Sequence, residues 1–195
     1  MVARSEESRQ AILQSTLELL GVGEQALSGT TVQRLTIEAI AKRAGVSKAT
    51  IYRWWPSKAA LVLDAFVVEY LPRTAVRTDL PFREALEDHV KAVVRQYAGL
   101  DGAMVAQLIA ESQYDPATLE EFHRRFWDDR REAAVALIQR GVNEGVIAAD
   151  ANPTLVATLI YAPIYQRLLL KDAPLDEQFA SSLIAMALTG AAARS

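Results

Sequence analysis

The segment 36–61 (TIEAIAKRAGVSKATIYRWWPSKAAL) constrains the fold more than any other, because it predicts two short helices joined by a tight turn. Thr36 is a good N-cap for the first helix, and Gly45 suits its exit because glycine readily adopts the left-handed conformation. Ser47 can cap the second helix, which ends before Pro56 because the residue preceding a proline avoids the helical conformation. Two short helices around such a turn form a helix-turn-helix unit, which can place its second helix in the DNA major groove.

The second helix of this unit has an outward face whose cationic and aromatic side chains are suited to binding a ligand. Ile51 and Trp55, four residues apart, share a side with Val46 and are expected to pack against the first helix. The side chains left on the outside are Lys48, Thr50, Tyr52, Arg53 and Trp54. Cations, a hydroxyl and flat rings suit phosphates, base edges and thymine methyl groups. The face therefore favours DNA binding over the alternative, a solvated surface helix with chance aromatic residues.

The whole segment resembles the DNA-binding signature of the tetracycline-repressor (TetR) family. The positions that match, in order and at the family spacing, are Thr36, Ile40, Ala41, Ala44, Gly45, Val46, Ser47, Thr50, Tyr52, Trp54, Trp55, Lys58 and Leu61. Trp54 and Trp55 depart from the family pattern, which more often has His or Tyr followed by Phe, and this leaves the base preference open. The link 21–35 is longer than usual, which leaves the helix boundary near residue 32 open.

The resemblance implies an all-α protein with an amino-terminal three-helix head on a larger helical body. Residues 1–60 would form the helix-turn-helix DNA-binding domain, and residues 61–195 would bind an effector and dimerise. The family roles predict contacts with phosphates or base edges by Thr36, Thr50, Tyr52, Trp54 and Lys58. Charge and position add Arg43 and Lys48 to this set.

The rest of the chain also reads as helices, because helix-length apolar stripes alternate with Pro, Gly, Asn and Asp and no useful strand-like alternation occurs. Outside the helix-turn-helix unit, helices are expected at 6–20, from after Ser57 to about 71, from Pro81, from Asp101, at 116–143, from Pro153 and at 175–192. Pro72 is expected to interrupt or kink the fourth of the chain's helices. The pattern thus predicts about nine helices and no sheet.

Charge is distributed unevenly along the chain. Residues 1–58 hold eight Lys and Arg against five Glu, which gives +3, whereas residues 59–195 hold thirteen against nineteen Asp and Glu, which gives −6. A basic end on an acidic chain fits a DNA-binding head on a body that avoids DNA. The absence of cysteine, the polar amino terminus and the lack of a run of ~20 apolar residues predict a soluble cytoplasmic protein without membrane spans.

The last two predicted helices are apolar on more than one side, so a second copy of the chain is expected to cover them. The predicted dimer interface consists of Leu155, Leu159, Ile160, Ile164, Leu183, Ile184 and Leu188. The family resemblance supports this homodimer, since such repressors pair through their two carboxy-terminal helices. The alternative is that both helices simply belong to the core of the subunit.

A small-molecule effector is expected mainly from the resemblance, because family members usually hold a small, often apolar ligand within helices four to eight. The residues predicted to bind it are Phe66, Tyr70, Gln96, Tyr97, Met104, Gln107, His123 and Trp127. For each apolar member of this set, ordinary core packing is the alternative. The sequence does not name the effector.

Catalysis and metal binding find no support in the sequence. The two histidines, His89 and His123, have no Cys or His at metal-ligand spacing, and no phosphate-binding loop or nucleophile elbow appears. No cofactor is expected. The leading prediction is a homodimeric repressor that binds a palindromic operator and is released by a small apolar effector. The alternatives are a ligand-independent or activating DNA-binding regulator, and a small-molecule carrier or enzyme without a DNA function.

Overall fold

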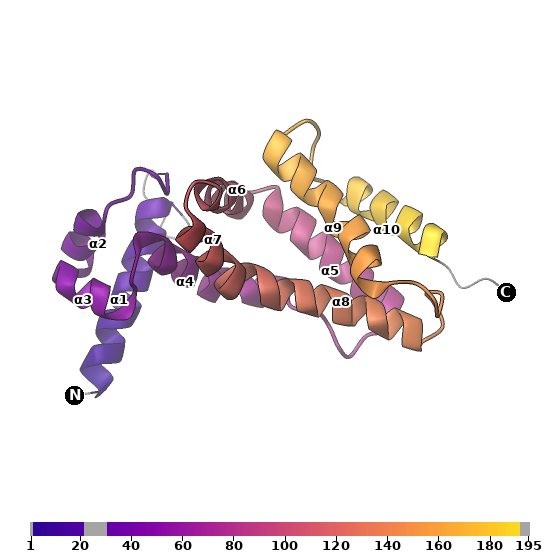
Figure 1. Cartoon of the computed structure of the whole chain (residues 1–195), viewed down its shortest axis with the longest axis horizontal. Coiled ribbons are helices and arrows are strands. Elements are labelled where there is room, and N and C mark those ends of the chain that lie inside the picture. Colours follow the sequence, from indigo (N-terminus) through magenta and orange to yellow (C-terminus); the bar gives the residue numbers. More distant parts are fainter. Residues whose placement is uncertain (1, 22–30, 192–195) are drawn as a thin grey trace. The chain divides into compact units, whose positions relative to one another are not determined.

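The computed structural model describes residues 2–21 and 31–191, and gives side chains for these except at 2–5 and 69–72. Within these residues the chain forms helices and turns and contains no strand, so the predicted all-α class is confirmed (Figure 1). The chain packs as two compact units: unit 1 is Met1–Tyr70 with Met104–Phe126, and unit 2 is Leu71–Ala103 with Trp127–Ser195. The predicted functional domains, 1–60 and 61–195, divide the chain differently and stay a prediction.

Unit 1 contains the amino-terminal helices and a hairpin from the middle of the chain. Its elements are α1 (Val2–Leu20), α2 (Ile37–Ala44), α3 (Lys48–Trp54), α4 (Lys58–Tyr70), most of α6 (Leu100–Ser112) and α7 (Pro116–Phe122). α1 packs against α2 and α4, and α4 packs against α7. The core is formed by large side chains with almost no exposed surface, among them Ile12, Ile40, Ile51, Trp55 and Phe66.

The helix-turn-helix geometry follows from the local chemistry that the sequence predicts. The Thr36 hydroxyl accepts a hydrogen bond from the Ala39 N–H at 3.2 Å, and the Ser47 hydroxyl accepts one from the Thr50 N–H at 3.1 Å. Between the two caps, Gly45 has φ +67°, which a residue with a Cβ adopts only with strain. The predicted caps and turn are thus confirmed, and the flank 22–30 lies outside the described residues.

Unit 2 is a bundle built on α5. Its elements are the 3₁₀ turn η1 (Leu71–Thr74), α5 (Phe82–Tyr97), α8 (Asp128–Asn143), α9 (Pro153–Leu170) and α10 (Glu177–Ala191). α5 packs against α8 and α10, and α9 packs against the same two helices (Figure 1). Gly141 permits the close approach of α8 to α5, since a Cβ there would come within 2.6 Å of the Phe82 ring. Asn152 caps α9 by accepting hydrogen bonds from the Thr154 and Leu155 N–H groups.

The predicted helix at 116–143 is continuous but contains an irregularity that periodicity did not predict. It comprises α7, a π-helical segment η2 (His123–Trp127) and α8. If α7, η2 and α8 are counted as one helix, the described residues contain nine helices, as predicted. Pro72 lies in the 3₁₀ turn η1, which confirms the predicted interruption after α4. No helix of the described residues is long and apolar enough to cross a membrane.

Three residues predicted to lie in the dimer interface are buried inside the subunit instead. Ile160 and Ile164 have no exposed surface, and Ile184 keeps only 8%. They belong to the core of unit 2, because α9 and α10 each turn one apolar side inward. Of the other predicted interface residues, Leu155 and Leu159 are exposed, and Leu183 and Leu188 are half-buried.

Candidate DNA interface and ligand cavity

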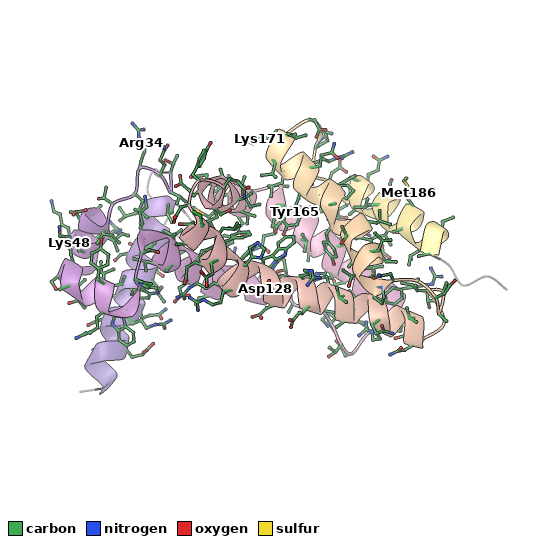
Figure 2. The ribbon with its side chains drawn as sticks, viewed as in Figure 1. Arg34, Lys48, Asp128, Tyr165, Lys171 and Met186 are labelled. Carbon is green, nitrogen blue, oxygen red and sulfur yellow. The ribbon has the colours of Figure 1, made fainter. Side chains whose placement is uncertain are left out.

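The face of α3 that points away from the core carries aromatic and cationic side chains. Ile51 and Trp55 are buried, whereas Tyr52 and Trp54 keep 53% and 36% of their surface exposed. Lys48 is exposed as well, and Figure 2 shows it at the edge of unit 1 beside α2 and α3. The predicted inward and outward sides of this helix are therefore confirmed.

Lys48 and Arg43 differ in how firmly unit 1 holds their charges. Lys48 Nζ lies 2.8 Å from Glu38 Oε1, but both side chains are more than half exposed, so solvent screens this pair. Arg43 Nε donates to Glu18 Oε2 at 2.6 Å, and the Glu18 side chain is only 14% exposed. The hydrogen bond from Arg43 is the main reason that the pKa of Glu18 is lowered. Lys48 is thus the easier of the two for a phosphate to recruit.

Thr36 and Thr50 have local roles in the structure. Thr36 is the N-cap of α2, and the Thr50 hydroxyl lies 2.9 Å from the Ser47 hydroxyl at the start of α3. Both lie at helix amino termini, which in general favour a phosphate.

Lys58 has a different environment from the one predicted. Its ammonium group donates to the backbone carbonyl oxygens of Val32 at 2.8 Å, Leu35 at 3.0 Å and Gln33 at 3.3 Å. An ammonium group has three donors, and these carbonyl groups occupy all of them. The predicted phosphate contact of Lys58 would require breaking this arrangement. In the structure, Lys58 ties the segment before α2 to the start of α4.

A polar cluster behind α3 was not predicted. The Trp55 indole N–H donates to Asp64 Oδ2 at 2.7 Å, and Asp64 also pairs with Arg125, which in turn pairs with Glu121. The Arg9 guanidinium lies 5.8 Å from the centre of the Trp55 ring. The signal for this cluster was available in the sequence, because a buried tryptophan at the end of a helix needs an acceptor for its N–H. The cluster fixes the carboxyl end of α3.

The predicted effector residues are divided between the two units. Phe66, Met104, Gln107 and His123 belong to unit 1, whereas Gln96, Tyr97 and Trp127 belong to unit 2. Two of the predicted polar anchors are already engaged. Gln107 Oε1 accepts from the Val32 N–H at 2.8 Å, and Gln96 Nε2 donates to Asp101 at 2.8 Å. His123 is exposed, and the side chain of Tyr70 lies outside the described ones.

Unit 2 contains a cavity of about 250 Å³ lined by the end of η1 with the segment after it, by Trp127 at the end of η2, and by helices α5, α8 and α9. Trp127 of the predicted set lines it, and Tyr97 lies close by, with its hydroxyl 3.0 Å from that of the lining residue Tyr165. Figure 2 shows Tyr165 among the helices of this unit. The lining residues that periodicity did not select include Thr74, Val76, His89, Arg130, Ala134, Ala157, Tyr161 and Tyr165. They come from four separate segments, so no local pattern could connect them.

Two uncharged side chains of the cavity wall each have a polar atom without a hydrogen-bond partner among the described residues. These atoms are Nδ1 of His89 and the hydroxyl oxygen of Tyr161, and both are buried. The two rings meet edge to face with 5.9 Å between their centres. Burial, helped by the charge of Arg130, lowers the pKa of His89 to about 4, and burial raises the pKa of Tyr161. At neutral pH the imidazole is therefore uncharged and the phenol protonated.

Comparison with known proteins agrees with this architecture. Residues 12–65 match the family of bacterial regulatory proteins called tetR, and residues 81–187 match the tetracyclin repressor-like C-terminal domain. The chain is 31% identical over 192 residues to an uncharacterized HTH-type transcriptional regulator, YdeS, of Bacillus subtilis, covering 98% of this chain and 93% of that one. It is 29% identical over 191 residues to the DNA-binding transcriptional repressor TetR of Mycobacteroides abscessus, covering 94% and 93%.

A solved structure has the same fold over almost the whole chain. The crystal structure of the TetR family transcription regulator SCO0332 superposes with a TM-score of 0.79 and 27% identity, covering 94% of this chain and 98% of that one. The helix-turn-helix unit and helical body thus define a DNA-binding transcriptional regulator rather than an enzyme. The chain belongs to the TetR family, as the residues of its helix-turn-helix segment predicted.

Proposed function

We propose that this regulator is a homodimeric repressor that binds a palindromic operator through α3 and is released by a small effector. The observation that carries the proposal is the outward face of α3, where Tyr52 and Trp54 are exposed beside Lys48 on a helix whose opposite side is buried. A two-fold dimer would present two copies of this face to two half-sites. Such a regulator works in the cytoplasm, where it meets the DNA.

At each half-site, Tyr52 and Trp54 are the groups proposed to reach base edges or sugar–phosphate surfaces. Lys48 would exchange its screened contact with Glu38 for a phosphate. Thr36 and Thr50 mark the two helix amino termini, whose N–H groups suit phosphate oxygens. Arg43 would contribute more weakly, since Glu18 holds it.

The dimer is proposed to form through the outer side of α9 and α10. Leu155 and Leu159 lie one turn apart on α9 with 57% and 59% of their surface exposed, and Met186 on α10 is 74% exposed. α9 and α10 pack side by side, so these residues belong to neighbouring helices. Burying exposed apolar side chains of this size under another apolar surface is favourable in free energy, and a second copy of the chain supplies such a surface.

The effector is proposed to bind in the cavity of unit 2 and to lower the affinity for the operator. Linkage requires that the operator lower the affinity for the effector by the same factor, typically worth about 1–3 kcal/mol. An activator would use the same face of α3 and the same cavity. A reporter gene placed behind the operator separates the two roles, because the repressor lowers expression until the effector is added.

The proposal is tested by footprinting on the DNA next to the gene, followed by binding assays with a palindrome found there. Tyr52→Ala is expected to weaken operator binding by roughly 1–3 kcal/mol if the ring contacts a base edge or phosphate. Tyr114→Ala is the matched control, since Tyr114 is also an exposed tyrosine of unit 1 but lies in the turn between α6 and α7. If the parent and both variants bind the operator with equal affinity, α3 is not the helix that contacts the DNA bases.

A further inference from the structure

The cavity of unit 2 has a polar edge that the folded chain leaves incomplete. Tyr161 and His89 line it with neighbouring rings, and the buried Tyr161 oxygen and His89 Nδ1 find no partner within the described part of the chain. An unpaired buried polar atom costs stability, and a phenylalanine would fill the place of Tyr161 without that cost. The two atoms are therefore arranged as they would be if a ligand completed their hydrogen bonds.

The remaining wall suits a flat ring. Trp127 and Tyr165 lie side by side, with 5.5 Å between ring centres and 60° between ring planes. Small side chains, among them Ala134 and Ala157, line the same cavity and leave space beside these bulky ones. A cavity of 150 Å³ is enough to hold benzene, so 250 Å³ accommodates a benzene ring with small substituents, about 10 non-hydrogen atoms in all.

The charges of the wall decide the polarity of the ligand. Arg130 is half-buried and donates to the Thr74 hydroxyl at 3.2 Å, whereas Asp129 and Arg131 are exposed and screened by solvent. The least screened charge of the cavity is therefore positive. It opposes a cationic ligand and attracts a carboxylate, for which the Tyr161 hydroxyl is a ready donor. The single N–H of the neutral His89 ring already serves the Thr74 backbone, which leaves Nδ1 as an acceptor.

We propose that this cavity binds a small aromatic carboxylate, with its ring against Trp127 and Tyr165 and its carboxylate at Tyr161 and Arg130. The inference deepens the proposed function, because it assigns a chemical class to the effector. Tyr161 is then a ligand-binding residue whose hydroxyl reduces the stability of the empty protein.

The test uses the full chain and four probes of nearly equal size in titration calorimetry. They are 4-ethylbenzoate, the uncharged 4-ethylacetophenone, the non-aromatic 4-ethylcyclohexanecarboxylate and the cationic 4-ethyl-N,N,N-trimethylanilinium. We expect 4-ethylbenzoate to bind with a Kd about tenfold lower than any of the other three. Binding of the ketone, the cyclohexane acid or the cation as tightly as 4-ethylbenzoate overturns the proposal, as does the absence of binding by all four.

Tyr161→Phe separates a ligand-binding role from a structural one. The variant is expected to bind 4-ethylbenzoate about tenfold more weakly, while its melting temperature without ligand stays level or rises. Tyr114→Phe is the control, because it removes an exposed hydroxyl of unit 1 and should change neither value. Unchanged affinity in Tyr161→Phe overturns the proposal. Operator binding is measured separately: 4-ethylbenzoate that binds but does not release DNA leaves the site standing and refutes the effector role.

Discussion

α3 of unit 1 and α9 of unit 2 both expose large side chains, but the two exposed sides are chemically different. α3 shows rings that carry polar groups, Tyr52 and Trp54, beside the cation of Lys48. α9 shows plain leucines, Leu155 and Leu159, over an inner side that is apolar as well. Polar rings and cations can form hydrogen bonds and ion pairs with a hydrated polyanion such as DNA. Leucine side chains lower the free energy only when another apolar surface buries them. The two surfaces therefore suit different partners, DNA for α3 and protein for α9.

The sharpest test of this comparison uses two neighbouring residues of α9. Ile160→Asp is expected to destabilise unit 2 by at least about 4 kcal/mol, because it places a carboxylate in the core without a partner. Leu159→Asp is the control for burial, since it changes an exposed position: it should leave the subunit folded and separate the dimer. Thermal unfolding and sedimentation measure the two effects. A well-folded Ile160→Asp subunit would contradict the inward orientation of this side of α9.

A second prediction concerns the buried His89 in the core of unit 2. The unfolded chain protonates this ring below its ordinary pKa of 6.5, whereas the folded protein resists protonation until about pH 4. Above pH 6.5 the ring is neutral in both states, so it does not change the free energy of unfolding. As the pH falls from 6.5 to 4, the unfolded chain takes up the proton and the free energy of unfolding decreases by roughly 3 kcal/mol.

The matching experiment is urea unfolding at several pH values. His89→Gln should flatten the loss of stability between pH 6.5 and 4, whereas His123→Gln, which changes the exposed second histidine, should keep the slope of the parent. If His89→Gln and the parent respond alike to pH, the burial of this ring does not govern the acid response.

A third prediction tests how firmly unit 1 holds the end of α3. Asp64→Ala removes the acceptor of the Trp55 N–H and a partner of Arg125, and should lower stability by about 2 kcal/mol. Operator affinity should fall with it, because α3 loses its fixed carboxyl end. Asp79→Ala is the control, since it breaks the exposed pair with Arg77 and should leave both measurements unchanged.

The smallest expected effect separates two lysines at the DNA-binding face. Lys48→Ala should reduce the salt dependence of operator binding, lowering the slope of log K against log salt by about one for each subunit. Lys58→Ala should instead lower the melting temperature and leave that slope unchanged, because its donors serve carbonyl groups of the chain. A lower slope in Lys58→Ala would show that this lysine leaves its carbonyl partners when DNA binds.

Local interactions explain why the helix-turn-helix unit was predictable from the sequence. Each of its caps joins groups three residues apart, as with Thr36 and Ala39 or Ser47 and Thr50, and the glycine turn depends on one backbone conformation. The same holds for α3, where a polar and an apolar side alternate with the helical period. In α9 that period carries no information, because both sides are apolar. Ile160 and Ile164 could therefore not be told from Leu155 and Leu159.

The sequence by itself determined the all-α class, the helix-turn-helix unit and the family, because these depend on caps, turns and residue spacing within short segments. Only the tertiary structure decided the role of Lys58, whose acceptors lie 23 or more residues away. It also decided the cavity, which His89, Trp127 and Tyr161 reach from different helices. Contacts between distant segments depend on how whole helices pack, and no local rule of spacing encodes that packing.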